Sequence, residues 1–220
     1  MQRRIVFALI LTALAPLCAA RAEYVPPQCQ TVYARMDAGP ETEALEAEFE
    51  ACQRAAIGVA PIEQRALDAR RVLRAQVTDG QHAVPVFVEY VEPKAGRPWL
   101  TVLSPIDGSA HRRVTVSKTS FDIVWRRWMA QPRHTPPVPQ ADVTVHFLVT
   151  FCIPGYLRTL VETANRGVTK SVQLDTCNIP EYKFSFFLLR RARHDIGPCP
   201  KSQIPDPSDA DRLLACLSTR

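Results

Sequence analysis

The sequence predicts an α+β fold, in which an N-terminal helical hairpin packs on a mostly antiparallel sheet of about seven strands and a short C-terminal helix follows. Three observations lead to this class. Apolar residues recur at spacings of three and four between positions 41 and 79. β-Branched and aromatic residues dominate after position 80. Six cysteines beyond position 28 fall into three regional pairs, which predicts a domain stapled by disulfides.

The composition excludes several classes of protein. With 46% hydrophobic and 22% charged residues, the 220-residue chain is typical of one globular domain and not of a disordered, collagenous or coiled-coil protein. Its 8 glycines are scattered among 19 prolines, so a glycine-rich phosphate loop or a dinucleotide-binding fingerprint is absent. The excess of arginine over lysine favours a bacterial source.

The first 22 residues have the pattern of a secretory signal peptide. Arg3 and Arg4 precede an apolar run over positions 5–17, which is too short to span a bilayer. The small residues around position 21 predict cleavage after Ala22. We therefore expect a periplasmic or secreted protein with no transmembrane segment, whose single domain covers residues 23–220.

Lipid attachment is a weaker alternative for the leader. Cys18 lies near a suitable position, but Pro16 and Leu17 precede it where a lipidation site needs a small residue directly before the cysteine. Loss of the leader removes three arginines and no acid, so the formal net charge falls from +5 to +2. A charge argument for nucleic-acid binding therefore fails.

The remaining cysteines predict a disulfide framework, because an exported chain enters an oxidising compartment. Metal binding is less favoured, since no two of them lie within four residues of each other. Six cysteines allow 15 pairings. We expect the sequential one: Cys29–Cys52, Cys152–Cys177 and Cys199–Cys216.

Residues 23–80 form the expected helical part. The spacing of apolar residues predicts one helix over 41–57, ended by Gly58, and a second over 61–79, which Pro61 begins. A tight connection between them predicts an antiparallel hairpin.

Residues 81–206 form the expected sheet part, and its proline-rich segment 132–139 predicts an extended loop. Pro85 lies in the first expected strand, 84–91, and predicts that this strand is near an edge of the sheet, because proline cannot donate a ladder hydrogen bond. Asn165-Arg166-Gly167 predicts a hairpin turn. In residues 207–220, Ser208 and Asp211 are spaced as a cap for a short helix. The expected strands cover 84–91, 99–103, 113–117, 121–129, 143–151, 156–164, 168–176 and 182–189.

Motifs of known chemistry are absent from the sequence. It has no Gly-x-Ser-x-Gly elbow, no His-Glu-x-x-His helix and no Cys-x-x-Cys pair. We therefore name no catalytic residue, no metal ligand and no cofactor, and no known family is identified. The dispersed histidines are His82, His111, His134, His146 and His194. The acids considered as a glycan-cleaving pair are Asp107, Asp122, Asp142, Glu162, Asp175 and Glu181.

The charge distribution is more informative. Residues 23–80 carry a net charge of −4 and residues 81–220 a net charge of +6. Arginine and tryptophan dominate interface hot spots, so two clusters predict a binding patch, with Arg112-Arg113 a weaker third. The alternative is that the arginines are merely solvated and the tryptophans belong to the core. The predicted patch comprises Trp125, Arg126, Arg127, Trp128, Arg190, Arg191 and Arg193.

These observations favour a non-enzymatic periplasmic protein that binds another envelope protein, for example as an inhibitor or immunity-type partner of a toxic or lytic enzyme. Contact with an anionic membrane surface is compatible with the same clusters. An envelope hydrolase acting on peptidoglycan or lipid is the first alternative. An accessory subunit of an envelope complex is the second.

Overall fold

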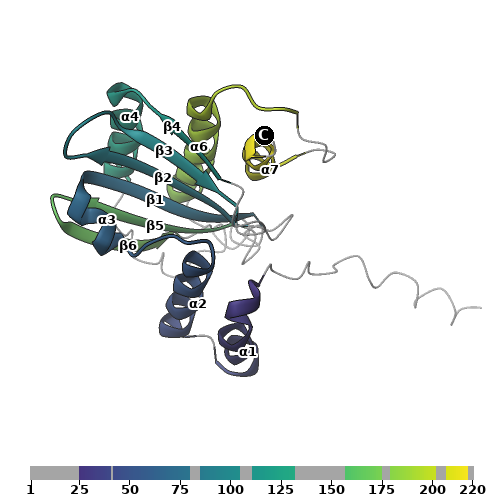
Figure 1. Ribbon diagram of the computed structural model, residues 1–220. Helices are drawn as coiled ribbons and strands as arrows, with labels where there is room; N and C mark the ends of the chain where they lie inside the picture. The colour runs from purple at the N-terminus through teal and green to yellow at the C-terminus, as the bar shows by residue number, and fades with distance from the viewer. Residues whose placement is uncertain are drawn as a thin grey trace, which may run out of the picture.

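The computed structural model describes residues 25–40, 42–79, 85–104, 111–131, 157–174, 179–201 and 207–217. These residues form an α+β fold around a six-stranded sheet in the order β4-β3-β2-β1-β5-β6, and every neighbouring pair is antiparallel (Figure 1). The strands are β1 (Ala69–Asp79), β2 (Pro85–Pro93), β3 (Trp99–Leu103), β4 (His111–Thr115), β5 (Leu157–Asn165) and β6 (Val168–Leu174).

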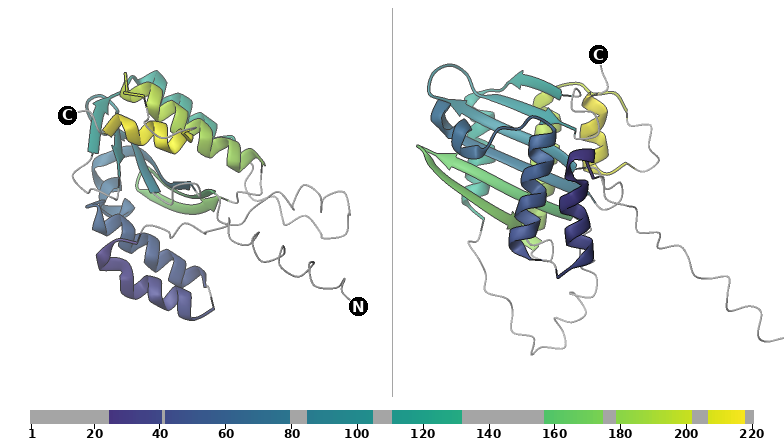
Figure 2. Two further views of the ribbon diagram at one scale, coloured as in Figure 1. Left: turned by 90° about the vertical axis from the view of Figure 1, so that its right-hand side faces the viewer. Right: turned by 60° about the horizontal axis from the view of Figure 1, so that its bottom comes forward.

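Helices lie on both sides of the sheet, as the left view of Figure 2 shows. One side, termed the helical face, carries α4 (Lys118–Met129), α6 (Ile179–Ile196) and α7 (Asp209–Leu214), which the short turn η2 (Ala215–Leu217) follows. The opposite face carries α3 (Ile62–Asp68) and a helical hairpin. The hairpin consists of η1 (Pro27–Cys29), α1 (Gln30–Ala38) and α2 (Glu43–Ala56).

The main core lies on the helical face of the sheet. Leu73 and Val88 from the central strands meet Phe121 of α4 and Phe184 and Leu188 of α6, and all five are buried. Burial of each such side chain contributes about 1.5–3 kcal/mol. A smaller cluster on the opposite face joins α3 to β1, β2 and β5: Ile62, Ala66, Ala69, Val72, Val91 and Ala164.

The predicted helix over 61–79 is wrong beyond residue 68, because the chain continues as β1. This strand lies between β2 and β5 with both of its faces covered. Residues 73–78 alternate between apolar and polar side chains, as a strand does, but Ala69, Leu73 and Val77 also recur every four residues and so fitted a helix as well. Because both faces are covered, polar residues such as Arg74 meet ionic partners inside the molecule. The helical hairpin is instead formed by α1 and α2, and its first helix, Gln30–Ala38, was not predicted.

Two predicted strands, 121–129 and 182–189, are helices. The Ser117 hydroxyl accepts a hydrogen bond from the Ser120 N–H at 3.0 Å and thereby caps the start of α4. In α6, Phe184, Leu188, Ala192 and Ile196 recur every four residues and are all buried. Both segments are rich in aromatic or apolar residues, and only the spacing of the buried ones identifies a helix.

Pro85 does not mark an edge strand, because β2 lies between β3 and β1. It is the first residue of the strand, where a missing N–H is tolerated. The turn at Arg166 and Gly167 is confirmed, with φ values of 50° and 85°. The cap of α7 is confirmed as a reciprocal capping box between Ser208 and Asp211.

Two predicted disulfides are confirmed: Cys29–Cys52 ties η1 to α2, and Cys199–Cys216 ties the segment after α6 to η2. The third pair, Cys152–Cys177, lies outside the described residues. So do the expected signal peptide, the proline-rich segment and the expected strand 143–151.

Candidate functional site

The two tryptophans of the predicted patch point into the molecule. Because α4 is a helix, Trp125 and Trp128 are three residues apart on one face, whereas a strand would have placed them on opposite sides. Trp125 is 9% exposed and stacks on Phe121, with ring centroids 6.1 Å apart. The half-buried Trp128 packs against Phe184 of α6 at 5.2 Å. Trp128 therefore holds α4 against α6, and the Trp125 ring faces β1, where the Arg71 guanidinium carbon lies 5.3 Å from its centroid.

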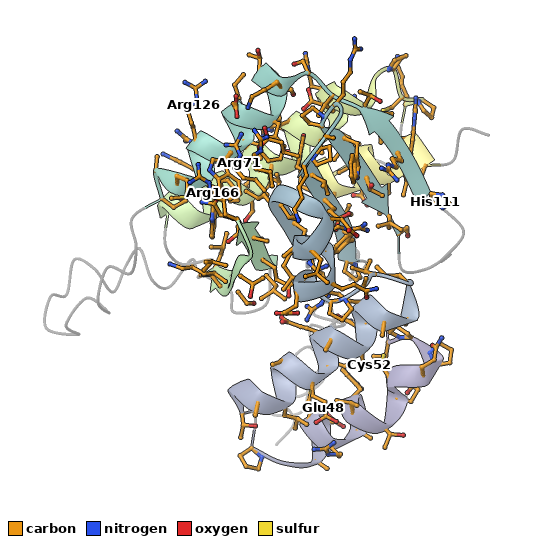
Figure 3. The ribbon with its side chains drawn as sticks, turned by 60° about the vertical axis from the view of Figure 1, so that its left-hand side comes forward. Glu48, Cys52, Arg71, His111, Arg126 and Arg166 are labelled. Atoms are coloured by element: carbon orange, nitrogen blue, oxygen red, sulfur yellow. A yellow bond between two sulfur atoms is a disulfide. The ribbon has the colours of Figure 1, made fainter. Side chains whose placement is uncertain are left out.

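The arginines between these tryptophans are exposed. Arg127 lies over the Phe187 ring of α6, with 5.8 Å between the guanidinium carbon and the ring centroid. The Arg126 Nε donates to the Asp122 carbonyl oxygen one turn earlier, and Figure 3 shows Arg126 far from the α1–α2 hairpin that carries Glu48. Arg126 and Arg127 form no ion pair within the described ranges, so their charges face solvent.

A shallow hollow of about 530 Å³ follows the outer side of α6. We call it the α6 face. Its six lining residues are one lysine, two arginines, one histidine and two phenylalanines, and none of the six is an acid. They recur at spacings of three and four along the helix: Lys183, Phe186, Phe187, Arg190, Arg191 and His194.

The predicted arginines of α6 differ in their surroundings. Arg190 is largely exposed, and its Nε donates to the Asp209 carboxylate of α7 at 2.6 Å. Arg191 points inward and pairs with Asp195, 2.9 Å away. Arg193 is exposed, forms no ion pair within the described ranges, and lies in the last turn, where the helix dipole favours a cation.

A buried polar cluster fixes α6 to α4 and β2. The Asp195 carboxylate accepts hydrogen bonds from the Tyr90 hydroxyl at 3.0 Å, from Ser120 and from Arg191. Burial, together with the nearby charge of Asp195, raises the pKa of Tyr90 well above its ordinary value. His194 contacts the same carboxylate at 3.2 Å and is mostly exposed. Because the cluster's polar groups satisfy one another, it gives the α6 face a rigid base.

A second ionic cluster lies on the opposite face of the sheet, and the sequence did not reveal it. Arg74 of β1 is 1% exposed and donates to the Glu162 carboxylate at 2.7 Å and to the Ala60 carbonyl oxygen at 2.6 Å. Arg54 of α2 lies 3.6 Å from the same carboxylate, and desolvation by burial lowers its pKa. These contacts join the helical hairpin to the central strands.

The other chemically reactive residues do not converge. Within the described ranges no group of three histidines, cysteines or acids is placed to hold a metal ion. Among the dispersed histidines only His111 and His194 fall within these ranges, on β4 and α6. Glu162 and Asp122 are both engaged by arginines and lie on opposite faces of the sheet. The side chains of the remaining histidines and acids considered from the sequence lie outside the described set: His82, His134, His146, Asp107, Asp142, Asp175 and Glu181.

No helix in the described ranges is both long and apolar enough to cross a membrane. The two disulfides fit an extracellular or periplasmic location, because both environments are oxidising. Comparison with known proteins found no family model, no curated protein and no solved structure that matches this chain.

Proposed function

We propose that this chain is an exported, non-enzymatic protein that binds another envelope protein through the α6 face, in the manner of an inhibitor or immunity-type partner. The α6 face is the observation that carries the proposal, since it combines exposed cations with aromatic rings in one hollow. Arginine and aromatic side chains supply most of the binding energy in protein interfaces. A partner with an acidic surface matches the charge of this face.

The rigidity of the α6 face supports this function. α6 is held on one side by the Asp195 cluster and on the other by Asp209, which belongs to the capped helix α7. The Cys199–Cys216 disulfide ties the residues after α6 to η2, the turn that follows α7. A surface that is ordered before binding loses less conformational entropy when a partner docks.

The N-terminal segment would direct export and would then be removed by cleavage after Ala22. Expression in a bacterial periplasm and intact-mass measurement would test this step. We expect a mature chain that begins at Glu23, and a retained leader or a lipid-modified Cys18 would contradict it.

The binding test uses the oxidised protein as bait in envelope extracts, beside the α6-face double variant, which combines Lys183→Glu in the α6 face with Arg193→Glu next to it, one residue before His194. These two cations form no ion pair within the described ranges, whereas reversal of Arg190 or Arg191 would break contacts that hold α6 itself. Lys170→Glu on β6 is the matched control, because it reverses an exposed cation elsewhere. We expect a stoichiometric partner that the control retains and that the double variant binds about tenfold more weakly.

Three results would refute the proposal. The double variant could retain the partner at full affinity, which would remove the α6 face from the interface. Wild-type protein could bind phosphatidylglycerol vesicles through this face and capture no protein, which would assign the face to a membrane surface. Turnover of peptidoglycan or lipid esters by the purified chain would favour the hydrolase instead.

A further inference from the structure

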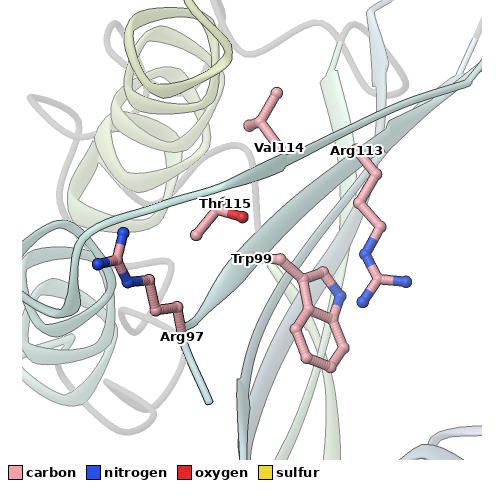
Figure 4. Close-up of a pocket in the computed structure, with 5 residues that line it drawn as sticks. All are labelled: Arg97, Trp99, Arg113, Val114 and Thr115. Atoms are coloured by element: carbon pink, nitrogen blue, oxygen red, sulfur yellow. The ribbon is translucent and has the colours of Figure 1, made fainter.

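A second hollow of about 530 Å³ lies at the edge of the sheet, on β3 and β4. We call it the edge hollow. It is lined by Arg97, Trp99, Arg113, Val114 and Thr115, and Figure 4 shows Trp99 between the two arginines. Arg113 and Thr115 point to one side of β4 and Val114 to the other, as alternate residues of a strand must. The hollow therefore follows the rim of the sheet and contacts both sides of it.

β4 is the outermost of the described strands on this side, and its only described neighbour is β3. The Val116 N–H donates to the Pro98 carbonyl oxygen at 2.9 Å, so the peptide groups of Val116, Val114 and Arg112 face β3. The intervening peptide groups, those of Arg113 and Thr115, point away from it. These outward groups can pair with an added strand.

The side chains of the edge hollow favour an acidic ligand. The Arg113 guanidinium carbon lies 4.1 Å from the centroid of the Trp99 ring, which holds the cation against an aromatic surface. Neither Arg97 nor Arg113 has a carboxylate partner among the described residues. A neighbouring hollow of about 230 Å³ lies on the same face of the sheet and includes Arg65 and the buried Glu89. These two side chains form an ion pair, with 3.2 Å between the Arg65 Nε and the Glu89 carboxylate, so their charges cancel. The net charge around Trp99 is therefore positive.

We propose that the edge hollow binds an extended acidic segment of a partner protein, which adds a strand to β4. Main-chain hydrogen bonds would form with the peptide groups of Arg113 and Thr115. Alternate side chains of the segment would be carboxylates beside Arg97 and Arg113, and those between them would be apolar and lie near Val114. Arginine pairs well with a carboxylate through two parallel hydrogen bonds.

A second copy of this chain fits the edge less well than an acidic segment does. Arg113 is the central residue of β4, so antiparallel pairing of two copies would place the Arg113 residues opposite each other. The proposal is also independent of the α6 face, because α6 packs on the helical face of the sheet and Trp99 lies on the other.

The test measures binding of a fluorescein-labelled peptide, acetyl-Glu-Val-Glu-Val-Glu-Val-Glu-amide, to the oxidised protein by anisotropy. We expect saturable binding, no binding of the peptide with lysine in place of glutamate, and a loss of about tenfold in affinity for Arg113→Glu. Lys170→Glu on the opposite edge strand and the α6-face double variant are the controls, and both should bind as the wild type does. Because the two surfaces are changed by different variants, a failure of the edge-hollow proposal can be told apart from a failure of the α6-face proposal.

Backbone pairing is tested separately from charge. Thr115→Pro removes an N–H that points away from β3, so we expect the sheet to survive, as the far-UV circular dichroism spectrum would verify, and peptide binding to be lost. A peptide that is N-methylated at alternate residues should likewise not bind when the methyl groups face β4.

Four results would overturn the proposal. The first is absence of peptide binding, and the second is unchanged peptide affinity in Arg113→Glu. The third is equal affinity for the N-methylated peptide whether its methyl groups face β4 or face away from it. The fourth is binding of trigalacturonate at the same site with the affinity of the peptide. The third would mean that charge alone attracts the peptide, and the fourth that the hollow selects carboxylates without adding a strand.

Discussion

Replacement of Arg74 by methionine tests the ionic cluster between the hairpin and the sheet. Arg74 is almost fully buried, and its guanidinium group donates to Glu162 and to the Ala60 carbonyl oxygen. Methionine has a similar length and retains much of the packing, so the main loss is electrostatic. Of its ion-pair partners within the described ranges, the Glu162 carboxylate would keep Arg54, which lies 3.6 Å away.

The expected magnitude follows from these contacts. Removing one partner of a buried ion pair costs about 3–5 kcal/mol, because the other charge remains desolvated. We expect about 3 kcal/mol here, the lower end, since Arg54 still neutralises part of the Glu162 charge. For a domain of this size the melting temperature would fall by about 6–12 °C.

Urea unfolding followed by far-UV circular dichroism would measure the change. Lys170→Met is the matched control, because it removes an exposed cation and should change the free energy of unfolding by less than about 0.5 kcal/mol. A triple variant, Arg74→Met with Glu162→Leu and Arg54→Met, should be more stable than Arg74→Met alone, since none of the three charges of this cluster is then left buried without a partner. A loss below about 1 kcal/mol in the single variant would refute the reasoning, as would a triple variant that is less stable than the single one.

Three further predictions concern other parts of the fold. Replacing both Cys199 and Cys216 by serine should lower the free energy of unfolding in urea by about 3 kcal/mol, because the disulfide closes a 17-residue separation; an unchanged value would contradict a structural role. Burial by itself would raise the pKa of Glu92 and of Asp122, but hydrogen bonds from Arg71 and Lys118 outweigh it and hold both pKa values below their ordinary range. Their contribution to stability is therefore complete above the unfolded pKa values, near pH 4, and is lost as the pH falls through the folded ones; a melting temperature that rises on acidification below pH 4 would contradict this. Finally, Gly167→Ala should cost about 1 kcal/mol in the same urea assay, because φ at this turn is 85°, and a stabilised variant would refute the need for glycine there.

The residues of the candidate sites were visible in the sequence to different degrees. Arg190 and Arg193 stood out by composition, and both are exposed on α6. Lys183, Phe186 and Phe187 did not, because a strand assignment for 182–189 separates residues that a helix brings to one face. The Arg97–Trp99–Arg113 arrangement could not be predicted, since it depends on the register between β3 and β4.

The sequence by itself determined features that depend on local chemistry. The α+β class, the capped helix at Ser208, the turn at Gly167 and two disulfides all follow from residue types at short spacings. Tertiary structure decided whether 69–79, 121–129 and 182–189 became strand or helix, because both conformations can bury such apolar residues and only the neighbouring elements select between them. It also turned Arg74 from an apparent surface cation into a buried one, since the partners that make its burial possible lie on α2, β5 and the loop before α3, far away in the sequence.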